Sequence, residues 1–358
     1  MPKSRKNLIR KVKYYEKVNW GIIGCGDVTE KKSGPAFNKI ESSKLAAVMR
    51  RDPVKAKDYA QRHGVPKWYS NAEKLIADPE IDAVYVATPP GSHAEYAIMA
   101  AEAGKHVYVE KPMALNYKQC LKMIEAAEKA GVMLFVAYYR RCLPAFLMVK
   151  KFVESGVIGK PHLLNVRLYR SSSEKLLQSE TLPWRFVPEI SGGGLFVDLA
   201  SHQLDYLDYL FGPIVSVKGF AANLSGQYPV EDTVCAAFSF ESGVLGSGSW
   251  CFSIPAKKEK DEVEIIGSKG KINFSVFDFS PLLLQSETDV ELIEFPRPEP
   301  IQEPLIRSVV DALLHGGECP STGVTAARTT KVMETILKDY YKPLAFGDPA
   351  GGQTFEKV

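Results

Sequence analysis

The first 137 residues alternate between short apolar runs and segments of helical periodicity, and this alternation restricts the fold more than any other feature of the chain. The apolar runs cover residues 18–23, 45–49, 83–87, 107–109 and 132–137. Helical patterns lie between them, over 53–63, 92–104 and 116–130. Strands that alternate with helices at this spacing are typical of βαβ units. The sequence therefore predicts an α/β domain with a doubly wound parallel sheet.

After about residue 160 the pattern changes. Strand-like runs cover 161–169, 214–222, 233–240, 244–252, 262–266 and 271–277. The glycine cluster Gly192–Gly194 precedes a helical stretch over 195–211, and two further helices are expected at 304–315 and 323–341. Short turn signals between the later runs favour hairpins. The second half is therefore expected to be α+β, an antiparallel sheet with a helix on one face.

Composition excludes several functional classes. Of the 358 residues, 45% are hydrophobic and 24% are charged, which is ordinary for a globular protein of about two domains. The formal net charge of +3 is too balanced to favour nucleic-acid binding. The sequence contains no run of 18 apolar residues, so we expect no helix that crosses a membrane. The 6 cysteines form no CxxC pair, so we expect no metal site and a reducing, cytoplasmic location.

The first apolar run ends in a G-x-G turn that opens a helical segment, Gly24–Thr29. Glycines let the backbone approach a pyrophosphate, and the first N–H groups of the following helix bind its oxygens. Thr29 stands where a third glycine is usual, a position that serves helix packing. A plain strand-to-helix turn is the alternative. The residues predicted to bind a dinucleotide here are Gly24, Gly26, Asp27 and Val28.

The second apolar run is followed by Arg50, Arg51 and Asp52, which bear on the choice between the two nicotinamide dinucleotides. NAD-binding domains usually place an acidic residue here to accept a hydrogen bond from the ribose 2′-hydroxyl. An arginine cannot accept that bond, but it can pair with a 2′-phosphate. Arg50 and Arg51 therefore favour NADP(H). In the alternative both arginines are solvated, and Asp52 binds the ribose of NAD(H).

Three residues are the candidates for catalysis. Lys111, in Glu110-Lys111-Pro112, follows the fourth apolar run, at the carboxyl end of a parallel strand, where doubly wound sheets bind ligands. Asp198 and His202 are four residues apart and share one face of the expected helix. A carboxylate beside an imidazole fixes its tautomer and raises its basicity, which suits His202 as a general base. The structural alternatives are a surface lysine and a salt-bridged helix, and the adjacent glycine cluster favours the site.

Weaker candidates lie near the same edge of the predicted sheet. Thr88 and Pro89 follow the third apolar run, and His93 begins a helix beside the expected cofactor. Tyr138 and Arg140 follow the fifth run and are expected at the substrate. Trp184 and Arg185 could stack on and hydrogen-bond a polar ligand, or only anchor a loop.

Taken in order, these residues resemble the Gfo/Idh/MocA family, the group of glucose–fructose oxidoreductase and inositol dehydrogenase, over about residues 17–345. The pieces that carry the resemblance are Gly24-Cys25-Gly26, Ala87-Thr88-Pro89, Glu110-Lys111-Pro112, Arg140-Arg141 with Pro144, and Gly192–Gly194 followed by Asp198, His202 and Asp205. Tyr139, Ala200 and Cys142 depart from residues that are common in the family.

The resemblance implies a Rossmann domain followed by an α/β domain with a large, mostly antiparallel sheet, through which members commonly form dimers or tetramers. By motif position Lys111 looks like the family's catalytic lysine, and Asp198 and His202 resemble its Asp/His pair. The nicotinamide would lie beside Glu110 and Lys111. The expected organisation is a flexible leader (1–17), a dinucleotide-binding domain (18–138), a substrate and oligomerisation domain (139–345) whose last helices pack back on the first, and a tail (346–358).

The leading hypothesis is an NADP(H)-dependent oxidoreductase that acts on a secondary alcohol or ketone of a sugar, a polyol or a related small molecule. His202 would take the hydroxyl proton, Lys111 would stabilise the oxygen, and Asp198 would orient the histidine or contact the substrate. Two alternatives remain open: a non-catalytic regulator that senses a dinucleotide, and a glycosidase of the same family that uses NAD transiently.

Overall fold

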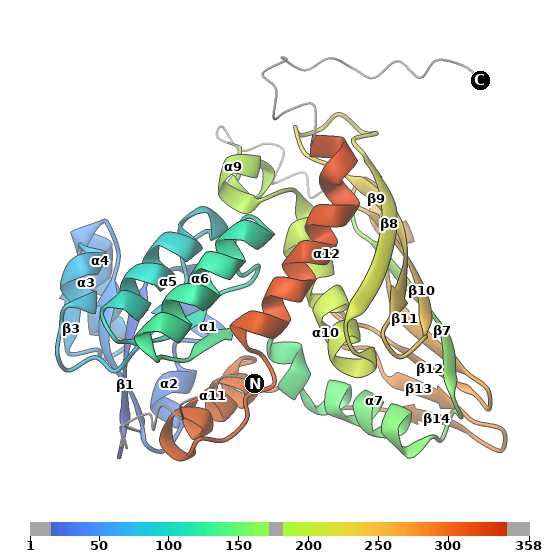
Figure 1. Ribbon diagram of the computed structural model, residues 1–358, viewed down its shortest axis with the longest axis horizontal. Helices are drawn as coiled ribbons and strands as arrows, with labels where there is room; N and C mark the ends of the chain where they lie inside the picture. The colour runs from blue at the N-terminus through green and yellow to red at the C-terminus, as the bar shows by residue number, and fades with distance from the viewer. Residues whose placement is uncertain (1–15, 172–181, 342–358) are drawn as a thin grey trace, which may run out of the picture.

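The computed structural model describes residues 16–171 and 182–341, which form two β-sheets with helices packed on them (Figure 1). The expected tail, nearly all of the expected leader and residues 172–181 lie outside the described residues. Within the described ranges, no helix is long and apolar enough to cross a membrane.

The first sheet has six strands, all parallel, in the order β3-β2-β1-β4-β5-β6. Their bounds are β1 (Val18–Ile23), β2 (Ser43–Met49), β3 (Lys67–Tyr69), β4 (Ala83–Val86), β5 (His106–Val109) and β6 (Leu134–Val136). The chain builds outward from β1 to β3, then returns to the other side of β1 with β4. That reversal leaves a crevice at the carboxyl ends of β1 and β4, where such sheets bind ligands.

Helices cover both faces of the first sheet. They are α1 (Asp27–Lys31), α2 (Ala36–Lys39), α3 (Pro53–Arg62), α4 (Ala72–Ile76), the 3₁₀ turn η1 (Pro90–Ser92), α5 (His93–Glu102) and α6 (Tyr117–Ala130). On one face Trp20 and Tyr85 pack with Phe37 of α2, and on the other Val86 packs in a cluster with Leu75 of α4. The two faces are therefore both buried, which explains the continuous apolar runs of these strands.

The second sheet has eight strands in the order β14-β13-β12-β11-β7-β10-β9-β8. Their bounds are β7 (Pro161–Tyr169), β8 (Ile214–Ala222), β9 (Thr233–Phe240), β10 (Leu245–Cys251), β11 (Lys260–Gly267), β12 (Lys271–Phe274), β13 (Leu282–Gln285) and β14 (Val290–Ile293). β7 and β10 pair in parallel at the centre, and the other pairs are antiparallel. Burial alternates along β9 and β10, so one face packs on helices and the other is exposed.

The remaining helices lie between the sheets or beside one of them. They are the 3₁₀ turns η2 (Tyr139–Cys142), η3 (Trp184–Phe186) and η5 (Ala256–Lys258), the π-helical turn η4 (Phe196–Ala200), and the α-helices α7 (Pro144–Ser155), α9 (Pro188–Ser191), α10 (Ser201–Phe211), α11 (Glu303–His315) and α12 (Gly323–Tyr341).

The end of the chain joins the two halves. In Figure 1, α12 runs between α6 and β8, and it contacts both of these elements as well as α10. Just before α12, Ser321 forms two hydrogen bonds with Val136 of the edge strand β6. The Val136 N–H donates to the Ser321 carbonyl over 3.2 Å, and the Ser321 hydroxyl donates to the Val136 carbonyl over 2.7 Å. Ala326 and Ala327 belong to the same buried cluster as Val86 and Val109. Residues from the second half therefore complete the first sheet.

The doubly wound parallel sheet and the mostly antiparallel second sheet are confirmed, with differences in detail. The strands β3, β13 and β14 were not predicted, because each has only three or four residues and lies at or near a sheet edge. The segment predicted as one helix over 195–211 begins with a π-helical turn, η4, before α10. That wide turn changes the angular spacing of the side chains at Asp198 and His202.

Candidate active site

A cleft between the two halves collects residues from the carboxyl edge of the first sheet and from η2, η3, η4 and α10. The predicted site residues that line it are Gly24, Gly26, Asp27, Val28, Arg50, Arg51, Thr88, Pro89, Glu110, Lys111, Arg140, Trp184, Arg185, Asp198 and His202. Lys32, Tyr139, Phe277 and Gln302 also line the cleft, and sequence reasoning did not propose them. The predicted residues Tyr138 and His93 do not line it.

The turn after β1 leaves room for a ligand. Gly24 has a φ of +90°, and a Cβ there would lie 2.6 Å from the Thr88 side chain, so only glycine fits. A Cβ on Gly26 would meet no atom of the described protein closer than 3.9 Å. The backbone N–H groups of Asp27 and Val28 make no hydrogen bond to the described residues. This glycine cradle with open donors suits the pyrophosphate of a dinucleotide.

Beyond this turn, positive side chains surround the end of β2. Arg50, Arg51 and Lys55 line the cleft, and the Arg50 Nη1 donates to the carbonyl of Cys25 over 3.2 Å. The carboxylate of Asp52 instead caps α3, because its Oδ1 accepts from the N–H groups of Val54 and Lys55. The residue that the alternative interpretation assigned to the NAD ribose is thus already engaged at one oxygen.

At the other end of the cleft, Lys111 and Asp198 form an ion pair between the two halves of the molecule. The Lys111 Nζ bonds the Asp198 Oδ1 and also donates to the Asp198 backbone carbonyl over 2.7 Å. The Arg185 Nε donates to Oδ2 of the same carboxylate over 3.1 Å. Burial disfavours the charged carboxylate, but the two cations outweigh it and hold the pKa of Asp198 at about 2. Asp198 is therefore ionised at neutral pH and holds Lys111 in place.

Glu110, the residue before Lys111, is buried and fixed from three sides. Its Oε1 accepts from the Tyr85 hydroxyl over 2.6 Å and from the Gln302 Nε2 over 2.7 Å, and its Oε2 accepts from the Lys111 N–H over 3.1 Å. Gln302 comes from the segment that begins α11, so that segment helps to hold the lysine turn.

His202 lies on α10 inside a ring of aromatic side chains. Its imidazole contacts Tyr138, Tyr139 and Phe277, with ring centroids 5.9, 5.3 and 6.0 Å away. Its Nδ1 is buried without a hydrogen-bond partner among the described residues. Burial lowers the pKa of His202 well below its usual value, and the charges of Arg140, Lys111 and Lys32 lower it further. The imidazole is therefore neutral at physiological pH.

The expected hydrogen bond between Asp198 and His202 is not formed, so the prediction that Asp198 fixes the tautomer of the histidine is wrong. Both carboxylate oxygens of Asp198 are used by Lys111 and Arg185. The cause is the π-helical turn that carries Asp198, because i and i+4 do not superpose across it as they do on an α-helix.

Two other expected residues have positions that differ from the prediction. Tyr138 is fully buried, and its neighbour Tyr139 lines the cleft in its place, because the chain turns into η2 at this point. His93 lies behind the cleft, with its ring nitrogens 2.9 Å from the Pro112 carbonyl and 2.7 Å from the Thr88 carbonyl. It therefore ties two cleft turns together from inside.

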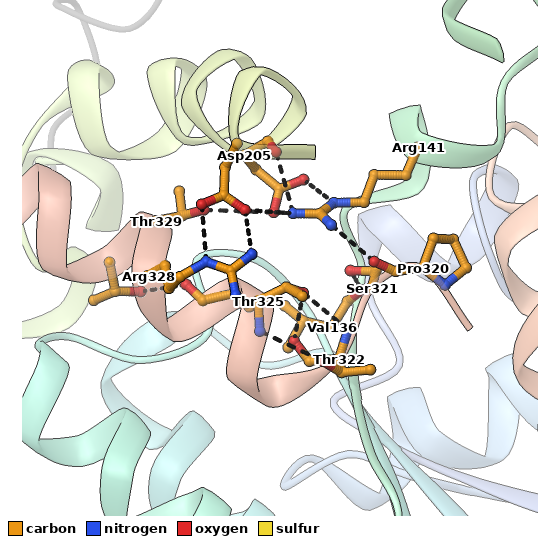
Figure 2. Close-up of polar contacts among 12 residues, drawn as sticks. Val136, Arg141, Asp205, Pro320, Ser321, Thr322, Thr325, Arg328 and Thr329 are labelled. Atoms are coloured by element: carbon orange, nitrogen blue, oxygen red, sulfur yellow. Dashed lines mark hydrogen bonds and ion pairs between the residues drawn. The ribbon is translucent and has the colours of Figure 1, made fainter. Parts of the chain in front are cut away.

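Asp205, the third polar residue predicted on the helix, faces away from the cleft chemistry and into a buried ionic cluster. The Arg141 Nε and Nη2 each donate to its carboxylate over 2.7 Å. The Arg141 Nη1 donates to the Pro320 carbonyl over 2.8 Å, so the guanidinium joins η2, α10 and the segment before α12 (Figure 2).

Among residues 16–171 and 182–341, no cluster of His, Cys, Asp and Glu could hold a metal ion.

The residues that sequence reasoning missed enter the cleft through tertiary contacts. Tyr139 was noticed only as a departure from the family pattern, although its neighbour Arg140 was a candidate. Phe277 and Gln302 come from segments far along the chain in which no sequence pattern pointed to the cleft. Lys32 lies just after α1, where a lysine is usually an ordinary surface residue.

Comparisons with known proteins agree across most of the chain. Residues 18–138 match the model "Oxidoreductase family, NAD-binding Rossmann fold", and residues 146–273 match the "GFO/IDH/MocA C-terminal domain". The chain is 41% identical over 320 residues to Oxidoreductase P35 of Formosa agariphila, which covers 89% of this chain and 98% of that protein. It is 31% identical to myo-inositol 2-dehydrogenase of Thermotoga maritima over 258 residues, 70% of this chain and 73% of that protein.

The fold is similar to that of a solved levoglucosan dehydrogenase in complex with NADH and levoglucosan. The TM-score is 0.81 at 24% identity, over 91% of this chain and 98% of that one. Together, the two family models match residues 18–138 and 146–273, which is more than half of the chain. The chain therefore belongs to the GFO/IDH/MocA family of oxidoreductases with an NAD-binding Rossmann fold.

Proposed function

We propose that this protein is an NADP(H)-dependent oxidoreductase that interconverts a secondary alcohol and a ketone on a sugar, a polyol or a related small molecule. One observation carries the proposal: a single cleft joins the glycine cradle at Gly24–Val28 to Lys111 and His202, which come from different halves of the molecule. Relatives named myo-inositol 2-dehydrogenase, 1,5-anhydro-D-fructose reductase and levoglucosan dehydrogenase support a sugar or polyol substrate.

The chemistry of the side chains fits alcohol oxidation. A nicotinamide dinucleotide bound along the cleft would accept or return the hydride. His202 is neutral, so its imidazole can accept the hydroxyl proton as the carbonyl forms. The Lys111 ammonium stabilises negative charge that develops on the same oxygen. Asp198 acts on the lysine rather than on the histidine, because its carboxylate positions the Lys111 Nζ.

The preference for NADP(H) rests on the charges at the end of β2. Arg50, Arg51 and Lys55 supply positive charge to the cleft, while one oxygen of Asp52 caps α3 and the other lies 3.9 Å from the Lys55 Nζ. A 2′-phosphate would pair with these cations, whereas a 2′-hydroxyl would need an acceptor. Charge-assisted hydrogen bonds of this kind contribute roughly 1.5–3 kcal/mol, which corresponds to a preference of about ten- to a hundred-fold.

Fluorescence titration with NADPH and NADH tests this preference. We expect the parent protein to bind NADPH more tightly, and Arg50→Asp to remove most of the difference. Lys57→Asp is the matched control, because Lys57 is exposed on α3 and does not line the cleft. Tighter binding of NADH by the parent, or an equal effect of the two substitutions, would contradict the assignment of Arg50.

The catalytic assignment is tested by turnover on a panel of sugars and polyols, followed through the absorbance of NADPH. We expect Lys111→Ala and His202→Ala each to lower kcat by about 10²–10⁴-fold. The matched control is His315→Ala, whose side chain is 70% exposed on α11. Turnover that survives within a few-fold would show that these roles are wrong.

Two other outcomes would favour other functions. Tight cofactor binding without turnover on any alcohol or ketone would favour a dinucleotide sensor. Cleavage of glycosides by protein that purifies with its cofactor, and that needs no added dinucleotide, would favour the glycosidase.

We also propose that the protein assembles as a homodimer or homotetramer through the exposed face of the second sheet. Apolar side chains gather there on neighbouring strands: Leu163 of β7 pairs with Leu245 of β10, and Phe220 of β8 pairs with Cys235 of β9. Phe220 is 85% exposed. An apolar patch on an open sheet face is typical of a protein interface.

A further inference from the structure

Arg140 is a buried cation without a counter-ion, and it lines the cleft. Only 3% of the residue is exposed, yet none of its nitrogen atoms pairs with a carboxylate among the described residues. Its Nε donates to the Val276 carbonyl over 2.9 Å, and its Nη1 is buried with no hydrogen-bond partner in the described chain. A guanidinium has five N–H groups, so most of its donors are unused.

The neighbouring Arg141 shows how this fold treats a buried arginine that has a structural role. It is 2% exposed, and its guanidinium donates to the carboxylate of Asp205 and to two backbone carbonyls (Figure 2). A buried charge is costly unless it is paired and hydrogen-bonded. Arg140 has no carboxylate partner of this kind. We expect this of a side chain whose counter-ion is supplied by a bound ligand.

The position of Arg140 indicates which ligand would supply that partner. Its guanidinium carbon lies 5.0 Å from the centre of the Tyr139 ring and 4.5 Å from that of Phe277. These are two of the rings that contact His202. Arg140 therefore lies at the chemical end of the cleft, away from the glycine cradle, and one small molecule can reach both the guanidinium and the imidazole.

The charges nearby agree with an anionic ligand. Arg140, Lys111 and Lys32 all act on His202 as positive charges, and no carboxylate offsets them there. The carboxylate of Asp198 is shared by Lys111 and Arg185, and Glu110 is enclosed by its own three donors. Within the described residues, neither of these carboxylates forms an ion pair with Arg140.

We propose that the substrate is a sugar acid, a uronic or aldonic acid whose carboxylate pairs with the free N–H groups of Arg140 while a secondary hydroxyl of the same molecule meets His202. The inference rests on the proposed function and narrows its substrate class. In the oxidation, the hydroxyl carbon would lose its hydride to NADP⁺ and the hydroxyl would lose its proton to His202, so that a ketone forms while the carboxylate stays unchanged.

Matched pairs of substrates test the proposal. The oxidation rates of D-glucuronate and D-glucose, of D-galacturonate and D-galactose, and of D-gluconate and D-sorbitol are compared with the cofactor at saturation. We expect kcat/KM for the acid to exceed that of its neutral partner by on the order of 10- to 100-fold, mainly through KM. An equal or higher value for the neutral member of every pair would overturn the proposal, and a preference for D-glucose 6-phosphate over D-glucuronate would overturn the carboxylate assignment.

Variants locate the effect. Arg140→Gln should reduce the acid-to-neutral ratio of kcat/KM to about 1, and Arg140→Lys should retain part of it, because an ammonium keeps the charge but not the planar fork. Arg307→Gln is the matched control on α11, where the side chain is 55% exposed, and it should keep the ratio of the parent. A ratio that Arg140→Gln leaves intact would show that the guanidinium does not bind the carboxylate.

A binding measurement separates this inference from the proposed function. Calorimetric titration of the NADPH complex with D-glucuronate and with D-glucose is carried out on the parent and on Arg140→Gln. Weaker binding of D-glucuronate to the variant, with NADPH affinity maintained, supports the proposal. A loss of NADPH affinity would assign Arg140 to the cofactor instead. If the cofactor binds and neutral sugars react but acids do not, the inference fails while the oxidoreductase function stands; if no alcohol reacts, the function itself fails.

Discussion

At the scale of single residues, the adjacent arginines of η2 have different energetic consequences. Arg141 neutralises Asp205, which is 1% exposed and which also accepts from the Thr329 hydroxyl at 3.4 Å. Arg140 neutralises no buried acid among the residues that the structure describes. Removing one partner of a buried ion pair leaves an uncompensated charge, whereas removing an unpaired charge does not.

We therefore predict opposite effects on stability. Arg141→Gln should lower the free energy of unfolding by about 3–5 kcal/mol, because the carboxylate of Asp205 stays buried without its cation. Arg140→Gln should change it by less than about 1 kcal/mol, and in either direction. Urea denaturation of the two variants and the parent, followed by circular dichroism, measures the difference. Equal destabilisation by the two substitutions would show that Arg140 also has a structural role.

The sequence largely predicted which residues belong to the candidate site. It did not predict which of these side chains bond to one another. Gly24, Lys111 and His202 could be chosen because each follows a strand or a glycine cluster in the sequence. The partner of Asp198 could not be, because the choice between His202 and Lys111 depends on a π-helical turn that no local pattern announced. The cleft position of Tyr139 rather than Tyr138 likewise depends on where η2 begins.

At the scale of elements, the glycine cluster is a tight junction that leads into the turn η4. A Cβ on Gly192 would lie 3.1 Å from the Leu115 carbonyl, and one on Gly194 would lie 2.8 Å from the Glu231 carbonyl. The Gly194 N–H donates to the Glu231 Oε1 over 2.8 Å, and the Tyr341 hydroxyl at the end of α12 donates to Oε2. Glu231 thus links the glycine cluster to the last helix.

This link makes stability depend on pH. Burial raises the pKa of Glu231 from 4.5 to about 7, against the effect of its hydrogen bonds. Below about pH 4.5 the carboxyl is protonated in both the folded and the unfolded chain, so its ionisation does not lower the free energy of unfolding. As the pH rises toward 7 the unfolded chain ionises first, so stability is lost, and the loss levels off above pH 7 at on the order of 3 kcal/mol.

Glu231→Gln should remove this loss, because an amide keeps an acceptor for Gly194 but does not ionise. We expect the stability of the variant relative to the parent to increase by about 2–3 kcal/mol between pH 5 and pH 8. Chemical denaturation at several pH values measures it. Glu287→Gln, in an exposed turn, should follow the pH profile of the parent. A constant difference between Glu231→Gln and the parent would contradict a raised pKa.

Most elements with strong periodicity were predicted well, because their burial is continuous or strictly alternating, but the helix α7 was not predicted. The first sheet's central strands are buried on both faces, and β9 and β10 alternate along their lengths. The missed strands β3, β13 and β14 gain their structure from the strand beside them, and three or four residues give too little pattern to recognise.

At the scale of the whole molecule, the exposed face of the second sheet is the surface through which we propose that the protein assembles. The outward side chains of the central strands include an ion pair between Arg167 of β7 and Glu262 of β11, with apolar groups such as Leu245 nearby. A patch of this mixed character suits a specific contact between two copies.

We predict that Phe220→Glu will weaken this assembly, because it places a charge in the apolar part of the patch. Size-exclusion chromatography with light scattering should show a smaller mass for the variant over a range of concentrations. Val54→Glu is the matched control, because Val54 is 75% exposed on α3 in the other half of the molecule. A monomeric parent, or an equal change in both variants, would contradict the proposed interface.

The hydrogen bonds between Ser321 and Val136 also have a consequence for how the protein is made. A ribosome completes β6 long before it reaches Ser321 and the two alanines of α12 that cover the same sheet. At about 5–20 residues per second, that interval is on the order of ten seconds. During this interval the edge strand β6 and an apolar surface of the nascent chain are exposed to solvent. We therefore expect chaperones that bind such surfaces during translation to increase the yield of this protein.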